Sequence, residues 1–158
     1  TLLFHNNRDV RIAAMGDLMY DKESTPKIRK FLYDRDIHVR SAALWLLSCL
    51  KDRESIPGLR KILINDEDLF MRNQAANALG KLGYKESIPA IRKLLEYSDT
   101  LTLENAAYAL GELNDKESIS RIKELLNNED KYVRQTVSEA LLKLGVPDSE
   151  IEKAKESR

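Results

Sequence analysis

The chain has 158 residues, and its 26 Lys and Arg side chains balance 26 Asp and Glu, so the formal net charge is zero. This balance gives no electrostatic attraction to nucleic acid or an anionic membrane. The sequence contains no run of the roughly 20 apolar residues that span a bilayer. It also shows no signal segment in which basic residues precede an apolar stretch. The single cysteine, Cys49, excludes an internal disulfide framework and favours a reducing compartment, so we expect a cytoplasmic protein.

Most of the chain is built from one unit of about 31 residues that contains two amphipathic segments. Residues 22–30 recur as residues 53–61, 85–93 and 116–124, and the shared glutamates at 23, 54, 86 and 117 are 31, 32 and 31 residues apart. A period of this length is typical of a solenoid, whose units bury their apolar faces against their neighbours.

The first segment of each unit is predicted to be a helix that begins at a serine, because serine is a good N-cap residue. These serines are Ser24, Ser55, Ser87 and Ser118. Proline follows in the first turn of three units, at 26, 57 and 89, where its missing N–H costs little.

The second segment is predicted to be a helix that begins at an N-capping Asp or Asn, namely Asn7, Asp36, Asp68, Asp99 and Asp130. We number this helix from the residue in the valine column, position 0, which is Val10, Val39, Met71, Thr102 or Val133. Positions 0, 4, 7, 8 and 11 are predicted to be buried, and position 4 is always Ala or Val, which allows close helix packing. Gly83 and Gly145 are predicted to end two of these helices.

The sequence therefore predicts one all-α solenoid domain, residues 1–158, with four helix pairs at residues 23–52, 53–84, 85–115 and 116–146. A partial repeat, residues 1–22, precedes them, because Leu2, Leu3 and Phe4 align with the last turn of a first helix. A polar segment, residues 147–158, is expected to cap the other end. Since the sequence opens inside a repeat without an initiating Met, we expect it to belong to a longer array.

Three motifs recur in these units: Asp-x-x-Val-Arg-x-x-Ala-Ala, the Ala-Leu-Gly-Lys-Leu-Gly of residues 78–83, and Glu-Ser-Ile-Pro-x-Ile-x-x-Leu-Leu. They resemble the short HEAT-like repeats of the phycobilisome-lyase type over essentially the whole chain, with departures at Leu103 and Ser120. The resemblance implies a right-handed α-α superhelix with the first helices outside and the second helices lining a concave face. It does not transfer lyase activity, because function depends on the site rather than the fold.

Positions 2, 6 and 9 of the second helix lie opposite the buried positions, at about 100° per residue. We expect this stripe, which contains no Lys or Arg, to bind a protein or peptide, because aromatic anchors beside adaptable polar groups suit such partners. Its two glutamates favour a basic ligand end, and the alternative is that the stripe is merely exposed. The candidate binding residues are Ile12, Ser41, Trp45, Asn73, Asn77, Glu104, Tyr108 and Glu139.

Two basic columns offer a different function. Arg11, Arg40, Arg72 and Arg134 have the geometry of a phosphate ladder, but the resemblance implies a structural role, and pairs such as Asp36/Arg40 have i, i+4 spacing. On the first helices, Lys30, Lys61 and Lys93 are expected to face solvent beside Arg29, Arg60 and Arg92, with Lys123 in the last copy. A nucleic-acid- or tRNA-contacting accessory domain is thus the first alternative, although zero net charge makes nucleic acid an unlikely partner.

The sequence shows no catalytic, cofactor-binding or metal-binding constellation, so we expect a non-catalytic scaffold without cofactor or metal. Iron-binding hydroxylases built from related repeats use His-Glu dipeptides, whereas His5 and His38 are followed by Asn and Val. Cys49 lies in an apolar stretch and is expected to be inert. A bilin lyase-like enzyme or chaperone is the second alternative, and it would need a larger aromatic pocket than Trp45 and Tyr108 supply.

Overall fold

The computed structural model describes residues 2–20 and 22–156, and within these ranges the chain forms helices and turns without a strand. Residues 1, 21 and 157–158, which belong to the predicted partial repeat and capping segment, lie outside the described residues. The first helices of the units are α2 (Thr25–Arg29), α4 (Ile56–Asn65), α6 (Ile88–Arg92) and α8 (Ile119–Glu124). The second helices are α1 (Arg8–Asp17), α3 (Ile37–Cys49), α5 (Leu69–Lys81), α7 (Thr100–Glu112) and α9 (Lys131–Lys143), and α10 (Asp148–Glu156) follows.

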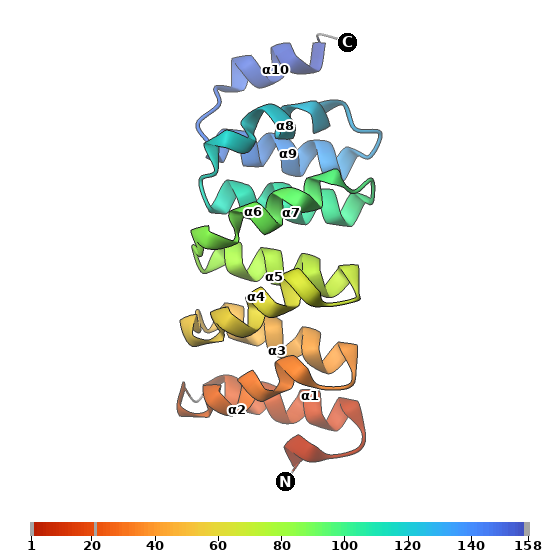
Figure 1. The fold of residues 1–158 in the computed structure, drawn as a ribbon, viewed down its shortest axis with the longest axis vertical. Helices are drawn as coiled ribbons and strands as arrows, with labels where there is room; N and C mark the ends of the chain where they lie inside the picture. Colours follow the sequence, from red (N-terminus) through yellow and green to blue (C-terminus); the bar gives the residue numbers. More distant parts are fainter. Residues whose placement is uncertain (1, 21, 157–158) are drawn as a thin grey trace.

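The helices stack in two layers along one axis, with the two ends of the chain at opposite ends of the stack (Figure 1). Successive helices α3, α5, α7 and α9 pack directly on each other, whereas neighbouring first helices in the described residues make little direct contact, even between α4 and α6. Where a solenoid curves, the layer with the more closely spaced helices lies on its inner side. We therefore call α1, α3, α5, α7 and α9 the inner layer and α2, α4, α6 and α8 the outer layer, and the predicted all-α solenoid is confirmed.

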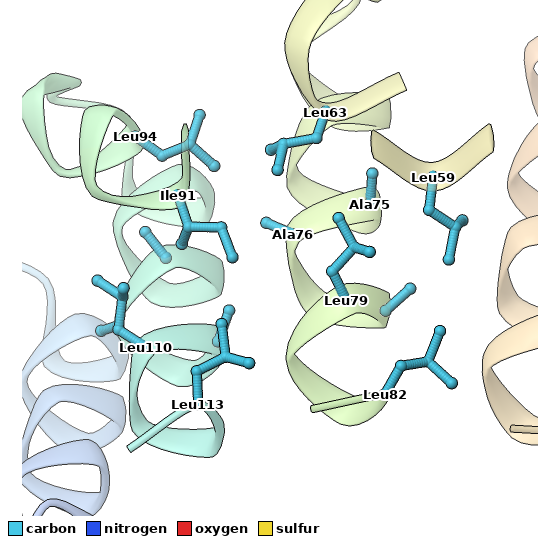
Figure 2. Close-up of a cluster of buried hydrophobic side chains, with 14 of the residues drawn as sticks. Leu59, Leu63, Ala75, Ala76, Leu79, Leu82, Ile91, Leu94, Leu110 and Leu113 are labelled. Carbon is cyan, nitrogen blue, oxygen red and sulfur yellow. The ribbon is translucent and has the colours of Figure 1, made fainter. Parts of the chain in front are cut away.

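A continuous apolar core joins the two layers through the whole stack. Figure 2 shows Leu59 and Leu63 of α4 near Leu79 of α5, and Ile91 of α6 near Leu110 of α7. All five side chains are at most 3% exposed, as the apolar spacing of both segments predicts. At the C-terminal end, Ile151 of α10 continues this core with 1% exposure.

Small residues bring the inner helices close together. A Cβ atom on Gly80 of α5 would lie 3.0 Å from the Cα of Ala109 in α7, and one on Gly111 would lie 3.2 Å from the Cα of Ala140 in α9. Gly80 and Gly111 occupy position 9, so the prediction that position 9 faces solvent is wrong there: the neighbouring inner helix covers it. Ser48, at position 9 of α3, is also buried.

We expect Gly80→Ala to lower the free energy of unfolding by about 1–3 kcal/mol, because the added methyl group would force α5 and α7 apart. Gly16→Ala is the matched control, since a Cβ on Gly16 in α1 meets nothing within 4 Å. That change should stabilise the protein by about 0.5 kcal/mol, because alanine is the better helix former. Urea unfolding monitored by circular dichroism measures both changes, and two effects of the same sign would contradict the close approach.

The inner helices begin as predicted. The side chains of Asn7, Asp36, Asp68, Asp99 and Asp130 each accept a hydrogen bond from a backbone N–H in the first turn, at 2.7–2.9 Å. Gly83 and Gly145 have φ of +67° and +88° just after α5 and α9, which confirms their role in ending these helices. Lys51 and Asn114 adopt the same left-handed conformation at the equivalent places after α3 and α7.

The outer helices begin at the four predicted serines, but the serine side chains do not cap them. A 3₁₀ turn precedes each outer helix, and none of the four serines makes a side-chain capping bond. Instead the buried Ser55 and Ser87 hydroxyls each donate to the backbone carbonyl three residues earlier, at 2.6 Å. The prolines do fall in the first turn of α2, α4 and α6, as predicted.

Candidate functional site

Most of the predicted binding residues lie on the solvent side of the inner layer, which we call the concave face. Trp45 of α3 is 53% exposed, and Glu139 of α9 is also exposed. The other five that remain accessible are half-buried, namely Ile12, Ser41, Asn77, Glu104 and Tyr108. The inner helices therefore present these residues side by side from successive repeats.

Asn73 is the exception, because its side chain is only 1% exposed and cannot contact a partner directly. Its Nδ2 donates to Thr102 Oγ1 at 2.8 Å, and the Thr102 hydroxyl donates to Asp99 Oδ2 at 2.7 Å. Beside it, Asn77 Nδ2 donates to Asn105 Oδ1 at 3.1 Å. These bonds form a polar seam between α5 and α7, so the inclusion of Asn73 among the binding residues is corrected to a structural role.

Three apolar side chains on this face were missed by the sequence prediction. Phe70, Leu101 and Tyr132 are 39%, 43% and 58% exposed, and each is seven residues before position 6 of its helix. Residues seven apart lie on nearly the same side of a helix, because two turns take about 7.2 residues. The concave face therefore extends one turn further toward the start of α5, α7 and α9 and gains an apolar row, and continuing the helical wheel backward from position 2 would have found it.

Positions 2, 6 and 9 contain no Lys or Arg, but lysine side chains lie directly beside them on the concave face. In α3, α5 and α7 position 10 rather than the buried position 9 remains accessible, and it holds Cys49, Lys81 and Glu112. In α9 both Leu142 at position 9 and Lys143 at position 10 are exposed. Lys143 Nζ lies 5.9 Å from the centroid of the Tyr108 ring and forms an ion pair with Glu112. In α5 and α7 the next inner helix covers position 9, so the accessible stripe continues at position 10.

A pocket of about 410 Å³ opens on this face between α7 and α9. Its lining residues are Tyr108, Glu112, Thr136, Glu139, Ala140, Leu142 and Lys143. This volume is within the range of small-ligand or side-chain sites, roughly 300–1,000 Å³. Its chemistry combines one aromatic ring with carboxylates on both helices.

Burial and nearby negative charge affect two ionisable groups of this region. Burial raises the pKa of Glu104, and the carboxylates of Asp130 and Asp99 raise it further. Burial also raises the pKa of Tyr108, with a further contribution from Glu112 that Lys143 opposes. Burial is the largest cause of both raised pKa values, and nearby carboxylates add to it.

The inner-layer arginines hold loops together. Arg134 donates to the carbonyl oxygens of Asn128 and Glu129 at 2.7 and 2.8 Å, and Arg11 Nη2 donates to Asp34 Oδ1 of the next repeat at 3.0 Å. The predicted i, i+4 side-chain pairing is replaced by these contacts, because residues such as Asp36 use their carboxylates as N-caps. Because these guanidinium groups already donate to loop carbonyls or a carboxylate, few of their N–H groups remain to bind phosphate.

The outer-layer arginines join successive repeats. Arg29 Nε donates to Asp52 Oδ2 at 2.7 Å, and Arg92 Nε donates to Asp115 Oδ2 at 2.8 Å, in both cases 23 residues further along the chain. At the equivalent place Arg60 lies 5.7 Å from the centroid of the Tyr84 ring. Lys30, Lys61 and Lys93 are exposed, as predicted. Because the arginines have local partners, the outer layer offers a weaker basic surface than the sequence suggested.

Among the described residues no group of three or more His, Cys, Asp or Glu side chains is arranged to hold a metal ion. Cys49 is exposed rather than packed in an apolar environment. No helix in the described ranges has both the length and the apolar character needed to cross a membrane.

Comparison with known proteins identifies the repeat and its structural relatives. Residues 1–76, 25–101 and 94–151 match the family described as HEAT repeats, whereas comparison with curated protein sequences gives no significant match. The fold is similar to the complex of CpcE and CpcF of phycocyanin lyase from Nostoc sp. PCC7120, with a TM-score of 0.80 and 22% identity over 94% of this chain. It is also similar to an engineered protein, with a TM-score of 0.64 and 19% identity over 98% of this chain and 91% of that one. This chain spans 64% of the lyase chain, and at this identity the likeness shows the fold alone.

Proposed function

The chain belongs to the HEAT-repeat family, and we propose that it is a non-catalytic scaffold that binds a protein partner on its concave face. The observation that carries this proposal is the gathering of exposed aromatic and aliphatic side chains on one face of successive inner helices: Trp45, Phe70, Leu101, Tyr108 and Tyr132. Large apolar side chains surrounded by polar groups are the usual anchors of protein interfaces.

The geometry suits an extended segment better than a small molecule. Inner helices pack about 8–10 Å apart, so Trp45 in α3 and Tyr108 in α7 are roughly 20 Å apart. This span corresponds to about six residues of extended chain. A segment lying along the solenoid axis would meet one inner helix after another, with the Phe70, Leu101 and Tyr132 row at its side.

The proposal includes a cytoplasmic location and a protein rather than a nucleic acid as the partner. A cytoplasmic location is consistent with the single free Cys49. Nucleic-acid binding is the less favoured function, because Arg29 and Arg92 already pair with carboxylates. The CpcE and CpcF structure is a complex between two proteins, which is consistent with a protein partner for this chain.

Replacing both Trp45 and Tyr108 by alanine should weaken partner binding by an order of magnitude or more, because aromatic anchors typically contribute about 2 kcal/mol or above. A photo-crosslinking residue at position 70 would first capture the partner in cells, and calorimetry would then compare its affinity for parent and variant. Circular dichroism should show an unchanged helical fold.

Tyr33→Ala is the matched control, because Tyr33 is 60% exposed but lies at the end of the 3₁₀ turn that follows α2, in the outer layer. The control should bind like the parent. Equal affinity of the parent and the Trp45/Tyr108 variant would reject the concave face as the docking surface.

A further inference from the structure

The pocket between α7 and α9 already contains a cation from the protein itself. Lys143 reaches across from α9, pairs with Glu112 of α7 and lies 5.9 Å from the Tyr108 ring centroid. An ammonium or guanidinium group over an aromatic face is attracted by the ring quadrupole, and an adjacent carboxylate adds to this attraction. The arrangement shows which type of group the pocket walls stabilise.

One lysine does not neutralise this region. Glu112 and Glu139 line the pocket, and Glu104 lies four residues before Tyr108, on the same side of α7. These three carboxylates outnumber the single ammonium group of Lys143. Glu139 accepts a hydrogen bond from the neutral Gln135 at 3.0 Å, which supplies no positive charge. A second cation would therefore be stabilised here.

Lys143 can also be displaced. Its side chain is 53% exposed, and exposed ion pairs contribute only about 0–1 kcal/mol to stability. The long aliphatic part of a lysine side chain allows the ammonium to move to solvent without disturbing the helix. An incoming cation could then contact Tyr108 and the two lining glutamates together.

From this geometry we propose that the pocket formed by Tyr108, Glu112 and Glu139 binds a basic side chain, arginine in particular, of the segment that docks on the concave face. This inference rests on the proposed function and adds the chemistry of the partner. Arginine fits better than lysine because its planar guanidinium stacks on an aromatic ring while donating to carboxylates at its edge. The exposed Leu101 and Leu142 flank the region and would contact apolar neighbours of that arginine.

The test uses two acetylated, amidated pentapeptides, Gly-Leu-Arg-Leu-Gly and the same peptide with citrulline, which has nearly the same shape but no charge. In NMR titrations of the full chain, the arginine peptide should shift the amide signals of Tyr108, Glu139 and Lys143. The citrulline peptide should bind about fivefold more weakly. Equal binding of the two peptides, or no binding of the arginine peptide, would overturn the inference.

Substitutions make the test specific. Glu139→Gln should weaken binding of the arginine peptide, whereas Lys143→Met should strengthen it several-fold, because it removes the competing cation. Lys81→Met is the matched control, since Lys81 is exposed at the same position 10 of α5. A weaker affinity for the Lys143→Met variant would contradict the competition.

The same spectra separate this inference from the proposed function. If both peptides shift Phe70 and Leu101 equally and neither affects Glu139, docking on the concave face stands and the arginine pocket is rejected. If the arginine peptide binds as described but partner affinity is unchanged in the Trp45/Tyr108 variant, the affinity of the pocket for arginine stands, whereas the docking surface and the assignment of that arginine to the partner are rejected.

Discussion

Leu110→Ala is expected to lower the free energy of unfolding by about 3–5 kcal/mol, the largest loss from any single change considered for this protein. Leu110 is fully buried in α7, where it lies in the core shared with α6 (Figure 2). Its truncation would leave a cavity that neighbouring helices cannot fill, because the closely packed inner layer prevents α7 from shifting. Equilibrium unfolding in urea measures the loss.

The location of this effect is also predictable. In a solenoid each repeat contacts only its neighbours, so destabilisation spreads outward from the altered repeat. Hydrogen exchange should therefore show the greatest loss of protection in α6 and α7 and the smallest in α1. Leu142→Ala is the control: Leu142 is 48% exposed on α9, and its loss should cost less than about 0.5 kcal/mol. Similar losses for the two leucines would contradict the assigned core.

Arg92→Met is expected to lower the free energy of unfolding by about 1–3 kcal/mol at pH 7, because it removes charged hydrogen bonds to the buried Asp115. The range is modest because the Arg92 side chain is 36% exposed and water screens part of the interaction. Chemical unfolding of parent and variant at several pH values measures this difference.

The pH dependence of that loss follows from Asp115. Burial raises the pKa of Asp115, but hydrogen bonds from Arg92 and Ser118 outweigh this effect, so the pKa lies below its ordinary value. A carboxyl group with a lowered pKa in the folded state stabilises the protein fully above its unfolded pKa, about 3.9. The contribution is lost as the pH falls through the folded pKa. The difference between parent and Arg92→Met should therefore be constant from about pH 5 to pH 7 and shrink in stronger acid.

Arg60→Met provides the control for this pH dependence. Arg60 has the same place in the preceding repeat, but its partner is the ring of Tyr84 rather than a carboxylate. A tyrosine side chain does not change its charge in acid, so the cost of this substitution should be the same at pH 3 and pH 7. A parallel loss of effect for both arginines would exclude Asp115 as the titrating group.

The helices and their inward faces were predictable because their determinants are local. The Asp and Asn side chains before the inner helices can reach only the N–H groups of the next turn, so residue type and position suffice to predict the cap. The serines before the outer helices have equally suitable chemistry. They failed as caps because a 3₁₀ turn continues directly into each helix and directs the hydroxyl backward.

The candidate site was predicted less completely, because it depends on what covers each position. Trp45 and Glu139 are exposed as predicted. The same helical wheel predicted that Asn73 is exposed, but the neighbouring helix α7 buries it. The wheel describes directions around one helix and contains no information about how near the next helix lies. Phe70 was missed for a simpler reason, since it lies about one turn before position 2 of α5, where the predicted stripe begins.

By itself the sequence determined the repeat, the two helices of each unit, their buried faces and the residues that begin the inner helices. Each of these follows from spacings within a few residues, and the same spacings recur in every repeat. Only the tertiary structure decided that Gly80 brings α5 against α7, that Arg92 pairs with Asp115, and that Lys143 lies over Tyr108. These contacts join residues 23 to 35 positions apart, and their distances are set by the packing of one helix on the next.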